Sequence, residues 1–274
     1  MRTVVLSLLW AIALPCTYGA AVDTVQVYSR AMSKKISNVV IHPETAQDAP
    51  LPVLYLLHGA YGSHVNWITR APEIQEYADQ YQVLIVCPDG DTTSWYFDSP
   101  IDTAFRYETY ISRELVSHID SAYQTIATRE GRAITGLSMG GHGAFYLAFR
   151  HPDIWGAAGS MSGGMDLRPF PDNWSLTQRL GPYATHRNNW EDNSVVNMLH
   201  LLSKKHPLAL IFDCGKDDFF LDVNRALKQE MDYRNIPHTY IERPGAHNWD
   251  YWREAVQYQL LFFEAFFRKQ TTSD

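Results

Sequence analysis

A serine between two glycines is the first feature of this sequence that could do chemistry. Residues 136–140 read Gly-Leu-Ser-Met-Gly, the spacing of a nucleophile elbow. In such an elbow a sharp turn between a strand and a helix holds the serine hydroxyl away from the backbone. Side chains at Gly136 and Gly140 would collide there, because strand and helix come very close. Ser138 is therefore the candidate nucleophile.

The residues on both sides fit a strand and a helix. Residues 132–135 form a short β-prone approach to the first glycine. Downstream, Ala144, Leu147 and Ala148 recur at helical spacing, and His151-Pro152 ends the run. This context favours an elbow over a glycine-rich turn that happens to contain a serine.

A serine hydroxyl is a weak nucleophile until a base accepts its proton and an acid orients that base. We expect both partners in loops after later strands, because open α/β sheets bind ligands at the carboxyl ends of their strands. His247 lies after the strand predicted over 238–242 and just before the last predicted helix. Asp217 and Asp218 both follow the strand predicted over 208–215, and their positions leave either as the acid.

Two backbone N–H groups should stabilise the oxyanion of a tetrahedral intermediate. The first is that of Met139, immediately after the nucleophile. The second is expected from the His-Gly turn at residues 58–59, which follows a buried apolar strand. Ala60 N–H is the first candidate and Tyr61 N–H the second, whereas His58 is interpreted as a residue that fixes the loop.

The remaining pattern predicts the frame that positions these groups. Near-continuous apolar runs at 51–57, 83–86 and 208–212 are typical of parallel strands buried on both faces. The loose alternation over 25–41 predicts an antiparallel pair at the sheet edge. Helical patterns lie between and after the strands, at 74–81, 107–121, 139–150, 223–235 and from Trp249 onward. Together they predict a doubly wound, mostly parallel sheet.

One segment is too long for an ordinary connection. Residues 163–206 separate two predicted strands and are rich in Trp, Asn, Pro and Arg, which predicts an insertion that roofs a cleft. Tyr61, Trp67 and Trp95 are the candidate substrate contacts. Their rings could stack on a sugar or an aromatic acyl group, or line a pocket for a short acyl chain.

Charge and the N-terminus restrict the partners. Residues 1–20 have the basic start, apolar core and small residues of a signal peptide, so we expect a secreted or periplasmic domain over 21–274. No other segment is apolar enough to enter a membrane stably. The net charge of −7 without a basic run argues against nucleic acid. Cys87 and Cys214, at the ends of apolar strands, are expected as buried thiols rather than a disulfide.

Four motifs in this order resemble the esterase D family of α/β hydrolases, with tributyrin esterases as the nearest likeness. They are Leu54-Tyr-Leu-Leu-His-Gly59, Gly136-Leu-Ser-Met-Gly-Gly141, Cys214-Gly-Lys-Asp-Asp-Phe219 and Gly245-Ala-His-Asn-Trp-Asp-Tyr-Trp252. The resemblance covers essentially the whole chain after residue 20. It implies an α/β-hydrolase fold with a mostly parallel central sheet, helices on both faces and an insertion between the sixth and seventh strands.

The family also includes S-formylglutathione hydrolases, feruloyl and acetyl-xylan esterases, and mycolyl transferases of the antigen 85 type. The resemblance implies that Asp218 is the acid, and it supports Ser138, His247 and the Ala60 N–H donor. It implies a serine carboxylesterase acting on short-chain or carbohydrate-linked esters, either small molecules or attached to polysaccharides. The alternatives are an antigen 85-type acyltransferase and a catalytically silent hydrolase fold used for binding. Neither His-Glu-x-x-His nor Cys-x-x-Cys occurs, so no metal or cofactor is expected.

Overall fold

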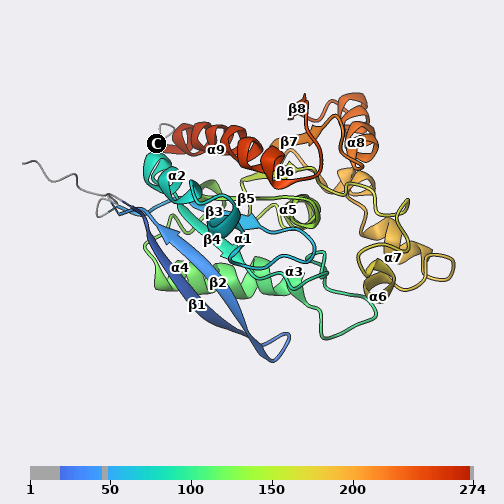
Figure 1. The fold of residues 1–274 in the computed structure, drawn as a ribbon, viewed down its shortest axis with the longest axis horizontal. Helices are drawn as coiled ribbons and strands as arrows, with labels where there is room; N and C mark the ends of the chain where they lie inside the picture. Colours follow the sequence, from blue (N-terminus) through green and yellow to red (C-terminus); the bar gives the residue numbers. More distant parts are fainter. Residues whose placement is uncertain (1–18, 45–48, 272–274) are drawn as a thin grey trace, which may run out of the picture.

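The central feature of the fold is a mixed sheet with the strand order β1-β2-β4-β3-β5-β6-β7-β8 (Figure 1). The computed structural model describes residues 19–44 and 49–271, and the predicted signal segment 1–20 lies almost wholly outside them. β1 and β2 are antiparallel to their neighbours, and β3 to β8 are parallel. The strands span Ala21–Ser29, Lys34–His42, Val53–Leu57, Leu84–Pro88, Arg132–Gly136, Ala157–Met161, Ala209–Gly215 and Thr239–Arg243.

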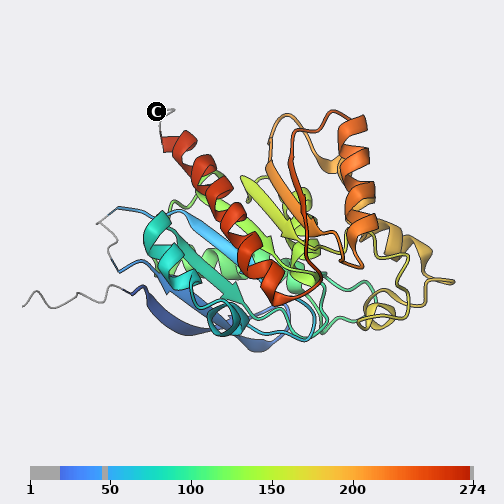
Figure 2. The same ribbon diagram turned by 45° about the horizontal axis from the view of Figure 1, so that its top comes forward.

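Helices cover both faces of this sheet, as the sequence predicts. α2 (Ile74–Tyr81) and α9 (Trp249–Thr271) lie on one face, with the short α1 (Asn66–Arg70). The other face packs against four helical elements that contribute to one apolar core: α3 (Tyr107–Thr109) with the π-helix Tyr110–Leu115, α4 (Val116–Ala122), α5 (Met139–Arg150) and α8 (Leu221–Tyr233). Figure 2 shows α9 crossing the sheet obliquely. A 3-10 turn, Arg129–Gly131, precedes β5.

The connection between β6 and β7 contains the predicted insertion. It carries α6 (Leu176–Leu180), α7 (Arg187–Asp192) and two 3-10 turns, Val195–Asn197 and Leu199–Leu201. In Figure 1 this part lies at one end of the molecule, beyond α5 and α8. Its buried side chains, among them Leu176, Leu180 and Trp190, join the core on the α5 face. The insertion is thus packed onto the domain, and its action as a cap stays a prediction.

Two other expectations concern the cysteines and membrane-spanning segments. Cys87 and Cys214 are free, buried thiols, as predicted. Among residues 19–44 and 49–271, no helix combines the length and the apolar character needed to cross a membrane.

A buried polar network ties α9 to three strands beneath their carboxyl ends. The Gln259 side chain donates from Nε2 to Asp213 Oδ2 on β7 at 2.7 Å and to Ser160 O on β6 at 3.1 Å. Thr135 on β5 donates from Oγ1 to Gln259 Oε1 at 2.8 Å. Burial raises the pKa of Asp213 from 3.8 to about 7, against the opposing effect of the hydrogen bond from Gln259. The Asp213 carboxyl group therefore keeps its proton to a higher pH than an exposed aspartate does.

The first prediction concerns the close approach at the elbow. A methyl group at Gly140 would lie 2.6 Å from His58 O and 2.7 Å from Leu57 O, both backbone atoms with little freedom to move. We expect Gly140→Ala to lower the free energy of unfolding by about 1–3 kcal/mol, the usual cost of overpacking. Urea denaturation followed by circular dichroism measures this. The parent protein, measured under the same conditions, is the control, and a free energy of unfolding equal to that of the parent would contradict the prediction.

The second prediction concerns Asp213. Because its folded-state pKa is raised, its contribution to stability is complete below about pH 4 and is lost as pH rises through about 7. Asp213→Asn removes this titration while keeping a side chain that can accept from Gln259. The stability of the variant relative to the parent should therefore increase between pH 4 and pH 8. Urea midpoints measured across that range test this, and a difference that is independent of pH would refute it.

Candidate active site

Ser138 stands on the turn between β5 and α5 with a backbone conformation that few non-glycine residues adopt. Its φ is 56° and its ψ −117°, and its N–H donates to Met161 O at 2.9 Å. The flanking glycines make the turn possible. A Cβ at Gly136 would lie 2.7 Å from the carbonyl carbon and oxygen of Gly140. The structure thus has the strand, elbow and helix that the G-x-S-x-G spacing predicts.

His247 connects Ser138 with Asp218. Its Nε2 lies 2.9 Å from Ser138 Oγ, and its Nδ1 lies 2.9 Å from Asp218 Oδ2 and 3.0 Å from Oδ1. A carboxylate only accepts hydrogen bonds, so Nδ1 carries the proton and Nε2 accepts from the serine hydroxyl. This arrangement leaves Nε2 ready to take the Ser138 proton.

The structure distinguishes Asp217 from Asp218, between which sequence position alone could not choose the partner of His247. The side chain of Asp218 is 0% exposed, and its Oδ1 also accepts the Phe220 N–H at 2.8 Å. Asp217 is exposed, and its backbone N–H donates to Gly245 O at 2.9 Å. Asp218 alone of the pair faces His247. Of the other histidines, His238 is held by Ile236 O at the start of β8, at the opposite end of that strand from His247.

The loop after β3 lies directly against the nucleophile. A Cβ on Gly59 would be 3.2 Å from Ser138 Cβ, so the backbone of this loop reaches the serine. Tyr61 N–H, the second candidate donor for the oxyanion, already donates to Thr92 O at 2.7 Å. Across the described ranges 19–44 and 49–271, neither Ala60 N–H nor Met139 N–H donates to a protein acceptor. Ala60 and Met139 are thus the pair of N–H groups that the geometry offers for an oxyanion.

His58 fixes the direction of the Ala60 N–H. Gly90 N–H donates to His58 Nε2 at 2.8 Å, so Nδ1 carries the proton and donates to Gly59 O at 2.8 Å. Gly62 N–H donates to the same carbonyl at 3.1 Å. Gly59 C=O and Ala60 N–H belong to one peptide plane and point in opposite directions. Holding the carbonyl therefore aims the N–H.

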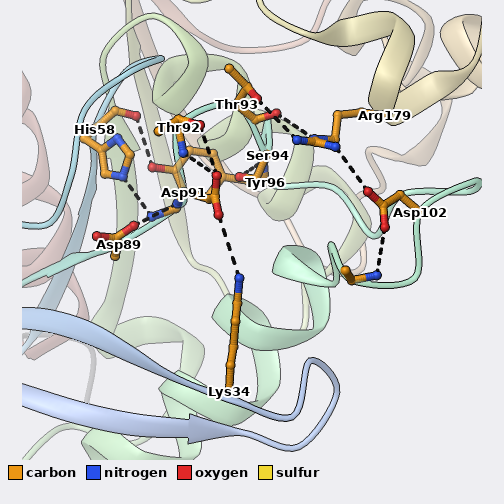
Figure 3. Close-up of polar contacts among 12 residues, drawn as sticks. Lys34, His58, Asp89, Asp91, Thr92, Thr93, Ser94, Tyr96, Asp102 and Arg179 are labelled. Carbon is orange, nitrogen blue, oxygen red and sulfur yellow. Dashed lines mark hydrogen bonds and ion pairs between the residues drawn. The ribbon is translucent and has the colours of Figure 1, made fainter.

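The chemistry of His58 agrees with its interpretation as a loop-fixing residue. It is 1% exposed, and burial lowers its pKa, which keeps the ring neutral. Its own carbonyl accepts the Tyr96 hydroxyl at 3.0 Å. Figure 3 shows both contacts that hold His58 from the segment after β4: one to its ring and one from Tyr96 to its carbonyl.

Aromatic rings surround His247. Phe219, 53% exposed, has its ring centroid 4.2 Å from that of His247, and Trp252 lies edge-on at 4.9 Å. Trp174 of the insertion stacks on Phe219 with centroids 5.8 Å apart and planes 20° from parallel. Sequence reasoning expected the Trp-rich insertion to cover a cleft, but it did not identify Phe219 as a neighbour of His247. The available signal was the position of Phe219, an aromatic residue immediately after the candidate acid.

The three residues predicted to contact substrate differ in their exposure. Tyr61 is 69% exposed beside Ala60 and is accessible to a ligand. Trp67 is completely buried, with its Nε1 donating to Leu57 O at 3.2 Å and its ring edge-on to Trp249. Trp95 is 1% exposed and donates to Trp174 O at 3.3 Å. The proposed contacts of Trp67 and Trp95 were therefore wrong, because both rings are packed inside the protein and a substrate cannot reach them.

Comparison with known proteins places the chain in a family. Residues 29–263 match the esterase family model, whose description is "Putative esterase". The acetyl esterase of Caldicellulosiruptor saccharolyticus is 25% identical over 258 residues, which cover 86% of this chain and 95% of that protein. The S-formylglutathione hydrolase of Paracoccus denitrificans is 25% identical over 250 residues, covering 84% and 87%.

The solved structures agree. The structure of a ferulic acid esterase superposes with a TM-score of 0.79 at 29% identity and covers 92% of this chain and 100% of its own. Its fold and the eight-stranded sheet described above confirm the α/β-hydrolase prediction. The chain belongs to this esterase family and is a carboxylic ester hydrolase.

Proposed function

We propose that this esterase acts through a Ser138–His247–Asp218 triad and a covalent acyl-enzyme. The observation that carries the proposal is the position of His247, whose two ring nitrogens lie 2.9 Å from Ser138 Oγ and 2.9 Å from Asp218 Oδ2. A base bonded at once to a nucleophile and to a buried acid is the arrangement that activates serine.

The reaction then runs in two balanced halves. Ser138 Oγ attacks the ester carbonyl carbon while His247 Nε2 takes the hydroxyl proton. The oxyanion accepts hydrogen bonds from Ala60 N–H and Met139 N–H. The carbon–oxygen bond to the alcohol breaks, and His247 returns the proton to the departing oxygen. Water repeats these steps on the acyl-enzyme and releases the carboxylic acid and free Ser138.

The substrate is proposed as a short-chain acyl ester or an ester on a carbohydrate, free or attached to a polysaccharide. The names of the acetyl esterase and ferulic acid esterase relatives support this class. The sequence of residues 1–20 supports export, so the enzyme would meet its substrate in the periplasm or outside the cell. Such a location argues against S-formylglutathione, the thioester in the name of another relative, as the substrate.

The nucleophile is tested by Ser138→Ala. We expect the rate of p-nitrophenyl acetate hydrolysis to fall by at least ~10⁴-fold, because the covalent route is lost. The variant should also no longer be labelled by a fluorophosphonate. Circular dichroism verifies folding. Turnover at the parental rate by the folded variant would sink the mechanism, and a parent chain that neither turns over ester nor takes the label would favour a binding protein.

The acid is tested by a matched pair of neighbouring substitutions. Asp218→Asn should lower kcat by roughly 10⁴-fold, because the amide no longer selects the productive tautomer of His247. Asp217→Asn makes the same chemical change at an exposed position one residue away, and its kcat should stay within about twofold of the parent, as surface changes generally have small effects. Steady-state kinetics on both variants decide the assignment, and the reverse ranking would make Asp217 the acid.

A further inference from the structure

An arginine from the insertion is buried behind the candidate oxyanion loop. Arg179, on α6, has a side chain that is only 9% exposed. Its Nε donates to Thr93 O at 3.2 Å, and its NH1 lies 3.3 Å from Asp102 Oδ2. The guanidinium lies over the Phe105 ring, 3.4 Å from the ring centroid. Burying a charged group is costly unless its partners are well placed, so this arrangement calls for an explanation.

Arg179 binds Thr93, which belongs to the segment 90–93 that contacts the oxyanion loop. Thr93 is next to Thr92, whose carbonyl accepts the Tyr61 N–H at 2.7 Å. Three residues before Thr93, Gly90 N–H orients the His58 ring, which in turn holds Gly59 O. The segment 90–93 therefore contacts the loop at two points, one on each side of Ala60. Figure 3 shows this row of contacts running from His58 to Arg179.

The other anchors of this segment are weaker. Lys34 Nζ lies 3.8 Å from Asp91 Oδ2, and both side chains are substantially exposed, at 40% and 30%. An exposed ion pair of that kind contributes about 0–1 kcal/mol. Asp91 Oδ1 accepts only the N–H and hydroxyl of its neighbour Thr92. Arg179 is thus a buried side chain that connects this segment to the insertion.

We propose that Arg179 is a positioning residue for the oxyanion hole: through Thr93 and Thr92 it holds the backbone that aims the Ala60 N–H. The insertion accordingly contributes to the rate of the chemical step. This inference rests on the proposed function, because it assigns a purpose to the Ala60 N–H that only acyl transfer provides.

The contacts explain why the residue is arginine. A planar guanidinium donates to Thr93 O from Nε and to Asp102 from NH1 while its face rests on Phe105. A lysine ammonium is a single point charge and cannot make these contacts together. Ser99 also ties together the backbones of the two ion-pair partners, because its Oγ donates to Arg179 O at 2.6 Å and accepts the Asp102 N–H at 2.9 Å.

The experiment compares Arg179→Lys and Arg179→Met with Arg187→Met. Arg187 is the matched control, since it lies in the same insertion, on α7, with a 69% exposed side chain paired to Glu191. For the Arg179 variants kcat on p-nitrophenyl acetate should fall about 10–100-fold, somewhat less than the loss of a whole oxyanion donor. KM should stay within about twofold, the shape of the pH profile should be unchanged, and Arg187→Met should behave as the parent.

A second readout reports the oxyanion hole directly. An aryl trifluoromethyl ketone forms a hemiketal oxyanion with Ser138, so its affinity should fall by the same factor as kcat in the Arg179 variants. A third readout is independent of activity. Amide hydrogen exchange in the peptides covering 58–62 and 90–93 should accelerate, because Tyr61 N–H and Gly90 N–H lose a fixed partner.

The outcomes separate this inference from the proposed function. Unchanged kcat and unchanged exchange in folded Arg179 variants would overturn it, as would a loss of kcat matched only by a loss of folded protein. If both variants fail to fold, Asp102→Asn decides, because it loosens the fork at a half-exposed position and should give smaller shifts in the same direction. An inactive parent would refute the proposed function, while the exchange measurement would still test whether Arg179 holds residues 90–93 and the loop 58–62.

Discussion

The candidate site depends on how closely three backbones approach one another. The end of β3, the end of β5 and the first turn of α5 meet with no space for a Cβ at Gly59, Gly136 or Gly140. This close approach brings the loop that carries Ala60 against Ser138, the residue that precedes Met139. It also forces Ser138 into a left-handed conformation that a relaxed turn would avoid. The strain persists because the sheet and the core of α5 hold both ends of the turn.

The parallel sheet brings the remaining groups to the same place. β7 and β8 end beside β5 and β6, so the loops carrying Asp218 and His247 emerge at the same edge as the elbow. The buried Gln259 then fixes α9 to β5, β6 and β7 below that edge. The loop with His247 is thus held at both ends, by β8 and by α9. Precision at the site comes from elements far apart in the sequence.

Sequence alone could predict whatever depends on local spacing. The buried strands, the elbow and the order of serine, acid and histidine follow from periodicity and from the glycines. Trp67 and Trp95 were misjudged because a tryptophan beside a motif looks the same whether its ring faces a cleft or the core. The contacts of Trp174 and Arg179 could not be derived because they depend on where the insertion folds back. The insertion has short helices and no periodic pattern from which its contacts could be derived.

The position of β8 has one further consequence. This strand pairs with β7 alone, and none of its five residues is fully buried, yet the loop that follows it carries His247. Edge strands of this kind open locally at a lower free energy than the strands in the middle of a sheet. An opening of β8 would separate the histidine from Ser138 while the elbow, the oxyanion loop and the main core stayed intact. The contact between His247 and Ser138 therefore depends on an edge strand of the sheet, whereas the elbow itself stands on a central one.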